Sequence, residues 1–162
     1  MALNACLKLV GQKQGQIKGS VTQKGREDSI LVHAYSHEIV IPHDSASGQP
    51  SGKRQHKPLI ITKEVDKATP ALHTAASSNE NLTSFTLQFW EPQTRGGTEV
   101  QSFTIKLTNA RIASVKSAML DNLDPLLTKS PLTEEWSFTY QKIEWTWNDG
   151  GLTSVDEWLS VL

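Results

Sequence analysis

Histidine and cysteine are the side chains in this sequence that would most readily bind a metal ion or act as a nucleophile. In an extended strand that rises about 3.3 Å per residue, His33 and His37 would lie about 13 Å apart, too far to share one zinc ion. His37-Glu38 is not followed by the second histidine of an H-E-x-x-H motif. The single cysteine, Cys6, lies in no local pattern typical of a protease nucleophile. We therefore predict no metal, no cofactor and no catalytic thiol.

A possible phosphate site is the stretch Gly48-Gln49-Pro50-Ser51-Gly52-Lys53-Arg54. Its glycines are one residue too close together for the G-x-x-x-x-G-K-[ST] motif, and Arg54 occupies the position of the magnesium-binding Ser or Thr. The sequence also lacks a helix pattern directly after it. The composition is that of a flexible basic loop, so we predict no nucleotide site.

Hydrolase chemistry finds little support in the sequence. There is no G-x-S-x-G motif. Glu134 and Glu135 would point to opposite faces of a strand, as solvated charges rather than an acid/base pair. We expect a structural or binding protein and not an enzyme, with a small hydrolase whose catalytic residues are dispersed as the alternative from another class.

Composition limits the partners. The chain has 162 residues, and its 16 Lys and Arg nearly balance its 17 Asp and Glu. Nucleic-acid binding leaves a large positive excess, which is missing here. No apolar run approaches the roughly 20 residues of a membrane helix, and no basic and apolar leader precedes Cys6. We predict one domain over residues 1–162, without a cleaved signal peptide, nucleic-acid partner or membrane insertion.

Alternating apolar residues predict strands along most of the chain, as in Leu3–Leu9, Phe85–Phe89 and Phe103–Leu107. Ser29–Ile41 has apolar residues on both faces and predicts one long extended run. A single helix is expected after residue 68, with Thr69 as N-cap and Pro70 at the first helical position, and it should end near Ser78.

The run from Trp136 to Trp147 contains a change of phase. Trp136, Phe138 and Tyr140 share one face, whereas Ile143, Trp145 and Trp147 carry the apolar side chains after a slip of one residue. Such a slip is typical of a strand that passes from one sheet to another or bends at a barrel corner. A similar misfit between Ile112 and Val115 predicts a bulge.

Two segments invite a role in assembly. Pro42–Pro58 is a long polar loop, and loops of this length are usually functional or disordered. Ser154 and Glu157 have the spacing of a capping box, and apolar residues follow at Val155, Trp158, Leu159 and Leu162. A short amphipathic helix is therefore possible at the C-terminus, packed on its own domain or against another subunit.

Several strings, taken in order, resemble the Hcp (haemolysin-coregulated protein) family, the tube component of bacterial type VI secretion systems. They are Ile17-Lys18-Gly19-Ser20-Val21, Arg26-Glu27-Asp28-Ser29-Ile30, His37, Ile41-Pro42-x-Asp44, Gly48-x3-Gly52-x-Arg54-x-His56-x-Pro58, Thr62-Lys63-Glu64-x-Asp66-x3-Pro70-x-Leu72, Tyr140-x-Lys142-Ile143-x-Trp145 and Ser154-x-Asp156-x-Trp158. Asp28 and Ala71 depart from the Gly and Tyr that are often found at these positions in the family.

The resemblance implies a mainly β fold: a two-sheet β-barrel with one short helix, which forms homohexameric rings that stack into a tube. A contractile sheath would drive the tube from the bacterial cytoplasm to the exterior or a target cell, with a spike protein at its tip and small effector proteins carried or chaperoned in its lumen. A contractile phage tail-tube protein is the alternative with the same architecture.

The resemblance also implies where subunits meet. In the family, the loop that corresponds to Pro42–Pro58 reaches toward an adjacent subunit. We therefore expect Lys53, Arg54, His56 and Lys57 to form a subunit-interface loop with positive charge. A conduit should be lined by small polar side chains, and Ser36, at the end of the Ile30–Ala34 apolar row, is the candidate for the lumen.

Overall fold

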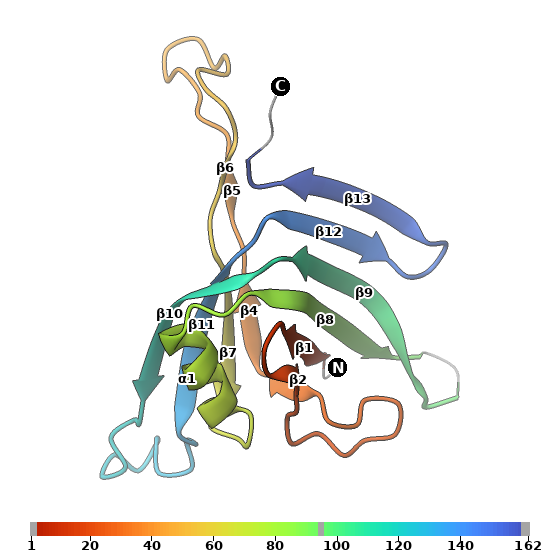
Figure 1. The fold of residues 1–162 in the computed structure, drawn as a ribbon, viewed down its shortest axis with the longest axis vertical. Coiled ribbons are helices and arrows are strands. Elements are labelled where there is room, and N and C mark those ends of the chain that lie inside the picture. The colour runs from red at the N-terminus through yellow and green to blue at the C-terminus, as the bar shows by residue number, and fades with distance from the viewer. Residues whose placement is uncertain (1–2, 94–95, 160–162) are drawn as a thin grey trace.

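The computed structural model describes residues 3–93 and 96–159, and its elements are mainly strands, as predicted (Figure 1). The elements are β1 (Asn4–Gly11), β2 (Gly15–Ile17), β3 (Ile30–Val32), β4 (Ala34–Ser36), β5 (Ile39–Val40), β6 (Gln55–His56), β7 (Leu59–Glu64), α1 (Thr69–Ser77), β8 (Leu82–Pro92), β9 (Glu99–Thr108), β10 (Arg111–Ala118), β11 (Thr133–Thr139), β12 (Lys142–Trp147) and β13 (Leu152–Glu157). No helix in the described ranges is long and apolar enough to cross a membrane.

The strands form two main antiparallel sheets. A seven-stranded sheet has the order β13-β12-β9-β8-β1-β2, with β3 also paired to β1, and a four-stranded sheet has the order β10-β11-β7-β4. Within the described residues the hydrogen-bonded path does not close on itself, so the expected closed barrel is not found. The sheets are joined instead where the chain crosses from one to the other.

The first crossing interrupts the predicted long run of Ser29–Ile41. Its first part, β3, belongs to the seven-stranded sheet, and β4 belongs to the four-stranded sheet. Between them the backbone N–H of His33 donates to the carbonyl of Thr62, 2.8 Å away. The apolar residues on both faces of this run therefore belong to two successive strands, each in a different sheet, and not to one continuous strand.

The second crossing confirms the predicted change of phase. β11 pairs with β7 and β10, whereas β12 pairs with β9 and β13. Trp136 and Phe138 before the slip are fully buried, and so is Ile143 after it. The predicted bulge is also present, as a register shift between Ile112 and Ser114 in the β10–β11 pair.

The core lies between the two sheets, with α1 over the four-stranded one. Phe85 of β8 meets Phe138 of β11 edge to face, with 5.0 Å between ring centroids. Side chains of both sheets and of α1 are excluded from water around this pair, which is the main driving force for the packing. These side chains include Leu7, Leu9, Ile30, Leu59, Ile61, Leu72, Leu87, Ile105 and Trp136.

The single helix occurs where it was predicted, but its N-cap position is Ala68 and not Thr69. The Thr69 hydroxyl is occupied elsewhere, because it accepts the backbone N–H of Asp66 at 3.1 Å and donates to the Glu134 carboxylate at 3.0 Å. Pro70 lies in the first turn, and the helix ends before Ser78.

The C-terminal helix prediction is wrong. After a turn in which Gly150 and Gly151 adopt φ of 89° and 67°, residues 152–157 form β13 along β12. A helix of this length gains little on its own, whereas a strand obtains a full ladder of hydrogen bonds. Trp158 packs against its own core. Leu162 lies outside the described residues.

Glu134 is not the solvated charge that its sequence position suggests. Lys63 and Glu134 form a buried ion pair, with 2.7 Å between Nζ and Oε2 and with both side chains almost fully excluded from water. Lys63 also contacts Asp66 at 3.0 Å, and the indole Nε1 of Trp136 donates to Glu134 at 3.0 Å. Burial alone would raise the pKa of the Glu134 carboxyl, but these hydrogen bonds from Lys63 and Trp136 hold its pKa below the usual value.

We predict that Glu134→Gln lowers the free energy of unfolding by about 3 kcal/mol, because the buried Lys63 ammonium loses its closest counter-charge and keeps only the contact with Asp66. Glu135→Gln, at the exposed neighbouring position, should change stability by less than about 0.5 kcal/mol. Urea denaturation of the two variants measures both. Equal effects would contradict a stabilising role for the buried pair.

Candidate functional site

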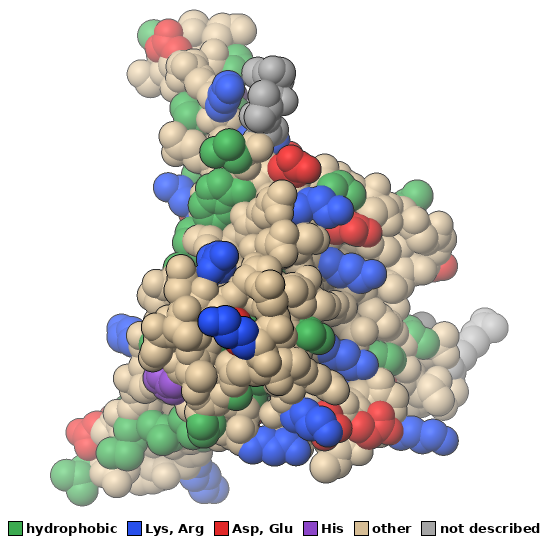
Figure 2. Space-filling view, in the orientation of Figure 1, with side chains coloured by type: hydrophobic (Ala, Val, Ile, Leu, Met, Phe, Trp, Pro, Cys, Tyr) green, Lys and Arg blue, Asp and Glu red, His purple; other side chains and the backbone are tan. Residues whose placement is uncertain are grey.

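The most prominent feature outside the core is an arm formed by residues 37–57, which comprises β5, β6, the loop between them and the residues that directly flank the two strands. Figure 1 shows the arm projecting away from the two sheets, and Figure 2 shows that its outer part stands clear of the body. Almost all of its side chains from Ile41 to Gln55 are exposed. The long loop expected from the sequence is therefore an extended hairpin.

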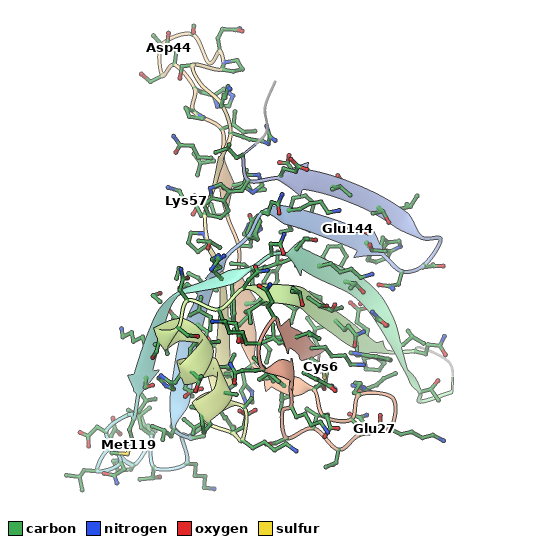
Figure 3. All side chains as sticks on the ribbon, viewed as in Figure 1. Cys6, Glu27, Asp44, Lys57, Met119 and Glu144 are labelled. Atoms are coloured by element: carbon green, nitrogen blue, oxygen red, sulfur yellow. The ribbon has the colours of Figure 1, made fainter. Side chains whose placement is uncertain are left out.

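The tip of the arm is held by its own hydrogen bonds. The Asp44 N–H donates to the carbonyl of Gln49, and the Gly48 N–H donates to the carbonyl of Asp44, each at 2.8 Å. The Asp44 carboxylate accepts the N–H of Ala46 at 2.9 Å, and this bond lowers the pKa of Asp44. Figure 3 shows Asp44 at the tip and Lys57 near the base.

The base of the arm is fixed to the body by four side chains, which we call the anchor: Arg54, His56, Tyr140 and Asp156. Arg54 donates hydrogen bonds from two nitrogens to the Asp156 carboxylate, and its Nε lies 2.5 Å from Oδ2. His56 Nε2 lies 2.9 Å from the same oxygen, and His56 Nδ1 lies 2.7 Å from the Tyr140 hydroxyl. The anchor thus joins the arm to β13 and to the crossing between β11 and β12.

Two further rings complete the base. His37, just before β5, places Nε2 2.7 Å from the same Tyr140 hydroxyl. Trp158 stacks on His56 with 5.8 Å between ring centroids and meets Tyr140 edge to face at 4.9 Å. Both strands of the arm are therefore bound to the body, one through His37 and the other through Arg54 and His56.

The electrostatics follow from these contacts. Hydrogen bonds from Arg54 and then His56 lower the pKa of Asp156 to about 2, against the opposing effect of partial burial. Burial, and then the negative charge of Asp156, raise the pKa of Tyr140. Burial, and then the proximity of His56, lower the pKa of His37. At neutral pH Asp156 is a carboxylate and Tyr140 keeps its proton.

The Asp156–His56–Tyr140 order resembles a catalytic relay, but its chemistry is unsuited to attack on a substrate. The Tyr140 side chain is only 5% exposed and the His56 residue 6%, and a raised pKa makes the phenol a poor nucleophile at neutral pH. Across residues 3–93 and 96–159, no three His, Cys, Asp or Glu side chains are grouped closely enough to hold a metal ion. The arrangement instead suits the mechanical task of fixing the arm.

The residues predicted for the interface loop divide into two pairs. Lys53 and Lys57 are exposed on the arm, as a charge for a neighbour would have to be. Arg54 is bound to Asp156 of its own chain, and His56 is buried, so they position the arm rather than present free charge. Arg54 and His56 therefore contribute to the attachment of the loop to its own domain.

Ser36, the lumen candidate, lies in β4, opposite Ile60 of β7 in the register. It is exposed at the edge of the four-stranded sheet. His33, which the sequence separates from His37, makes its contact elsewhere, with Nε2 3.3 Å from Glu64. The two histidines thus have separate partners.

Sequence reasoning did not connect Tyr140, Asp156 or Trp158 with the loop at residues 42–58, although all three occur in the strings that resemble the Hcp family. Asp156 lies about 100 residues from Arg54 in the chain, so no local pattern could connect them. The available signal was compositional: an arginine and a histidine two residues apart in a polar loop, and two adjacent acids, Asp156 and Glu157, in a tail that is otherwise uncharged after Gly151.

A second long-range pair, also without a local signal, fixes the loop after β2. The Arg26 side chain is 4% exposed and pairs with Glu99 of β9. Its guanidinium carbon lies 4.2 Å from the ring centroid of Trp90, which is a cation–π geometry. The hydrogen bond from Arg26 lowers the pKa of Glu99.

Comparison with known proteins gives a consistent result. Residues 7–147 match the family described as "Type VI secretion system effector, Hcp". The "Major exported protein" of Pseudomonas aeruginosa is 38% identical over 169 residues, covering 99% of this chain and 98% of that protein. This chain, with its two antiparallel sheets and projecting hairpin, therefore belongs to a class of proteins of type VI secretion systems.

Solved structures agree. The Hcp1 protein of E. coli EAEC 042 is 32% identical with a TM-score of 0.86, covering 98% of this chain and all of that one. The secreted protein Hcp3 of Pseudomonas aeruginosa is also 32% identical, with a TM-score of 0.79 and the same coverage. The chain is a member of the Hcp family, which confirms the resemblance found in the sequence.

We predict that Asp156→Asn loosens the arm and lowers the free energy of unfolding by about 2 kcal/mol, because it removes the charge that two hydrogen-bond donors share. Asp149→Asn, which makes the same change in the exposed β12–β13 turn, is the control and should have almost no effect. Urea denaturation gives the stability. Similar values for the two variants would mean that the anchor contributes nothing to the fold.

Proposed function

We propose that this protein is a tube subunit of a type VI secretion system, which forms homohexameric rings that stack and are exported by contraction of a sheath. The observation that carries the proposal is the arm: an exposed, hydrogen-bonded hairpin, fixed at its base and free of its own domain at its tip. An element with that construction is suited to contact a second copy. Contacts between two different surfaces of identical subunits close into rings or propagate as filaments.

The proposal gives roles to the predicted site residues. Lys53 and Lys57 would meet acidic groups on an adjoining subunit or ring, while Arg54 and His56 hold the arm in position. Ser36 would line the lumen, where a small polar side chain lets cargo bind weakly enough to leave. Residues 1–162 would form one Hcp-like domain.

The partners of such a subunit are further copies of itself, a spike protein at the tube tip, the sheath, and small effectors carried or chaperoned in the lumen. It would reside in the bacterial cytoplasm before firing and then be secreted without a cleaved signal peptide. Relatives whose names describe them as exported or secreted support this path. Nucleic-acid binding, membrane insertion and a cofactor have no place in this function.

A contractile phage tail-tube protein would use the same architecture, but membership of the Hcp family favours the secretion system. A hydrolase would need an accessible nucleophile, and the Asp156–His56–Tyr140 relay has none. Assays of the purified protein with ester, phosphate and peptide substrates should show no turnover above that of buffer.

Native mass spectrometry tests the oligomer. The expected particle has about six times the subunit mass of 17.9 kDa, and electron microscopy should show rings. A monomer at tens of micromolar, confirmed by light scattering, would refute the proposal.

Reversing the charge of the arm tests its role. Lys53→Glu with Lys57→Glu should weaken stacking and secretion, since contacts of about 0 to 1 kcal/mol each are repeated around every ring. The loss should be greater at low salt, where repulsion is unscreened. Lys13→Glu with Lys24→Glu changes the net charge equally at exposed positions outside the arm and is the control. An arm variant that stacks and is secreted like the parent would show that these lysines are not interface residues.

A further inference from the structure

One feature at the base of the arm is unnecessary for simple attachment: the Tyr140 hydroxyl is shared by the imidazoles of His37 and His56. The Tyr140 oxygen lies 2.7 Å from His37 Nε2 and 2.7 Å from His56 Nδ1. A hydroxyl has one hydrogen to donate, so it can donate to only one of the two nitrogens and must accept from the other. The positions of the protons along this chain are therefore coupled.

At neutral pH the contacts specify one arrangement. Asp156 is an acceptor only, so His56 Nε2 carries a hydrogen and donates to it. With both imidazoles neutral, His56 Nδ1 then accepts the Tyr140 hydrogen, and His37 Nε2 donates to the Tyr140 oxygen. Every contact has one donor and one acceptor.

One additional proton can be placed on either histidine without the loss of a hydrogen bond. On His37 it leaves the chain of hydrogen bonds unchanged, and on His56 it reverses the direction of the Tyr140 hydroxyl, which then donates to His37. A second additional proton, which makes both histidines cationic, cannot be placed in this way. Both ring nitrogens would point a hydrogen at the Tyr140 oxygen, and the hydroxyl hydrogen, in a side chain that is 5% exposed, would lose its acceptor.

The surrounding groups make the second proton still less favourable. Two imidazolium ions would share one phenol oxygen, so their like charges would repel at close range. Of the charged groups in the described chain that bond to this network, Asp156 faces His56, and Arg54 lies on the other side of Asp156, where it already neutralises the carboxylate. Burial, and then the proximity of His56, lower the pKa of His37, which likewise disfavours its protonation.

We propose that His37, Tyr140, His56 and Asp156 form an acid-sensitive latch, which fixes the arm at neutral pH and releases it when both histidines become protonated. His37 precedes β5 and His56 lies in β6, so each side of the arm contributes one histidine, while Tyr140 and Asp156 belong to the body. Breaking these contacts frees the arm without touching the core between the sheets. Because the arm is the assembly element of the proposed function, acidification then also weakens the stacked rings, and this consequence rests on that function.

The direction and the size of the pH effect on the latch follow from proton linkage. A histidine takes up a proton as the pH falls through about 6.5, and the geometry of the latched state accommodates one proton fewer than the released state does. The latch is therefore fully stable above about pH 6.5 and weakens as the pH falls below it. Between about pH 7.5 and about pH 5.5, one proton of difference multiplies the population of the released state about tenfold.

Hydrogen exchange measured by mass spectrometry tests the latch independently of assembly. The reporters are the backbone bonds at the base of the arm, from Lys57 N–H to Glu38 and from Trp158 N–H to Gln141. After correction for intrinsic rates, their exchange should accelerate about tenfold between the two pH values, while amides of the core β8–β9 pair remain unchanged. No acceleration at the base, or an equal acceleration in the core, would overturn the latch.

Two variants make the test specific. In His37→Gln the amide still bonds to Tyr140 but cannot be charged, so exchange at the base should respond to acid by less than about twofold. His33→Gln removes a histidine that pairs with Glu64 outside the latch and should keep the full response. A full acid response in His37→Gln would overturn the proposal.

Light scattering of the same samples separates the latch from the proposed function. Acid-accelerated exchange together with loss of stacked particles, both suppressed in His37→Gln, supports the two together. Accelerated exchange with unchanged particles supports the latch and refutes the role of the arm in stacking. Loss of particles in the parent and in His37→Gln alike, without accelerated exchange, refutes the latch alone.

Discussion

The crossing of the chain between its two sheets is the constraint on which the remaining structure depends. Apolar side chains before and after the crossing must face the same core, so the alternation has to slip by one residue between β11 and β12. The slip places Tyr140 in neither sheet but at their junction, with its ring against the core and its hydroxyl at the margin. The base of the arm is attached to Tyr140, so the geometry of the two sheets determines where the arm begins.

Charged groups reinforce this frame at three places where strands alone would leave a segment loose. Lys63 and Glu134, a pair within the four-stranded sheet, hold the start of α1 through the Thr69 hydroxyl. Arg26 and Glu99 hold the loop after β2, and Arg54 and Asp156 hold the arm. A buried ion pair adds little net stability compared with apolar residues of the same volume, but one partner alone is costly. Such pairs therefore select one position for each segment more than they strengthen the fold.

The sequence predicted the features that depend on neighbouring residues. Alternation identified the strands, Pro70 located the helix, and the phase of Trp136 and Ile143 revealed the crossing. The errors came from contacts made at a distance. The tail from Ser154 to Glu157 satisfies a helix-capping pattern, and only the free edge of β12 decides that it is a strand. Likewise, Glu134 is indistinguishable from a surface acid until β7 brings Lys63 beside it.

The same limit explains why the arm looked like a flexible basic loop. Its strands β5 and β6 are only two residues long each, and a two-stranded ribbon of this size has little stability in water by itself. The direction of the arm must therefore come from its base, where Arg54 and His56 meet a carboxylate about 100 residues away in the chain. A hairpin ordered in advance loses less conformational entropy on binding than a flexible loop would. The few exposed side chains of the arm can then be effective in an assembly that repeats them in every copy, and any change at the base alters all of these contacts together.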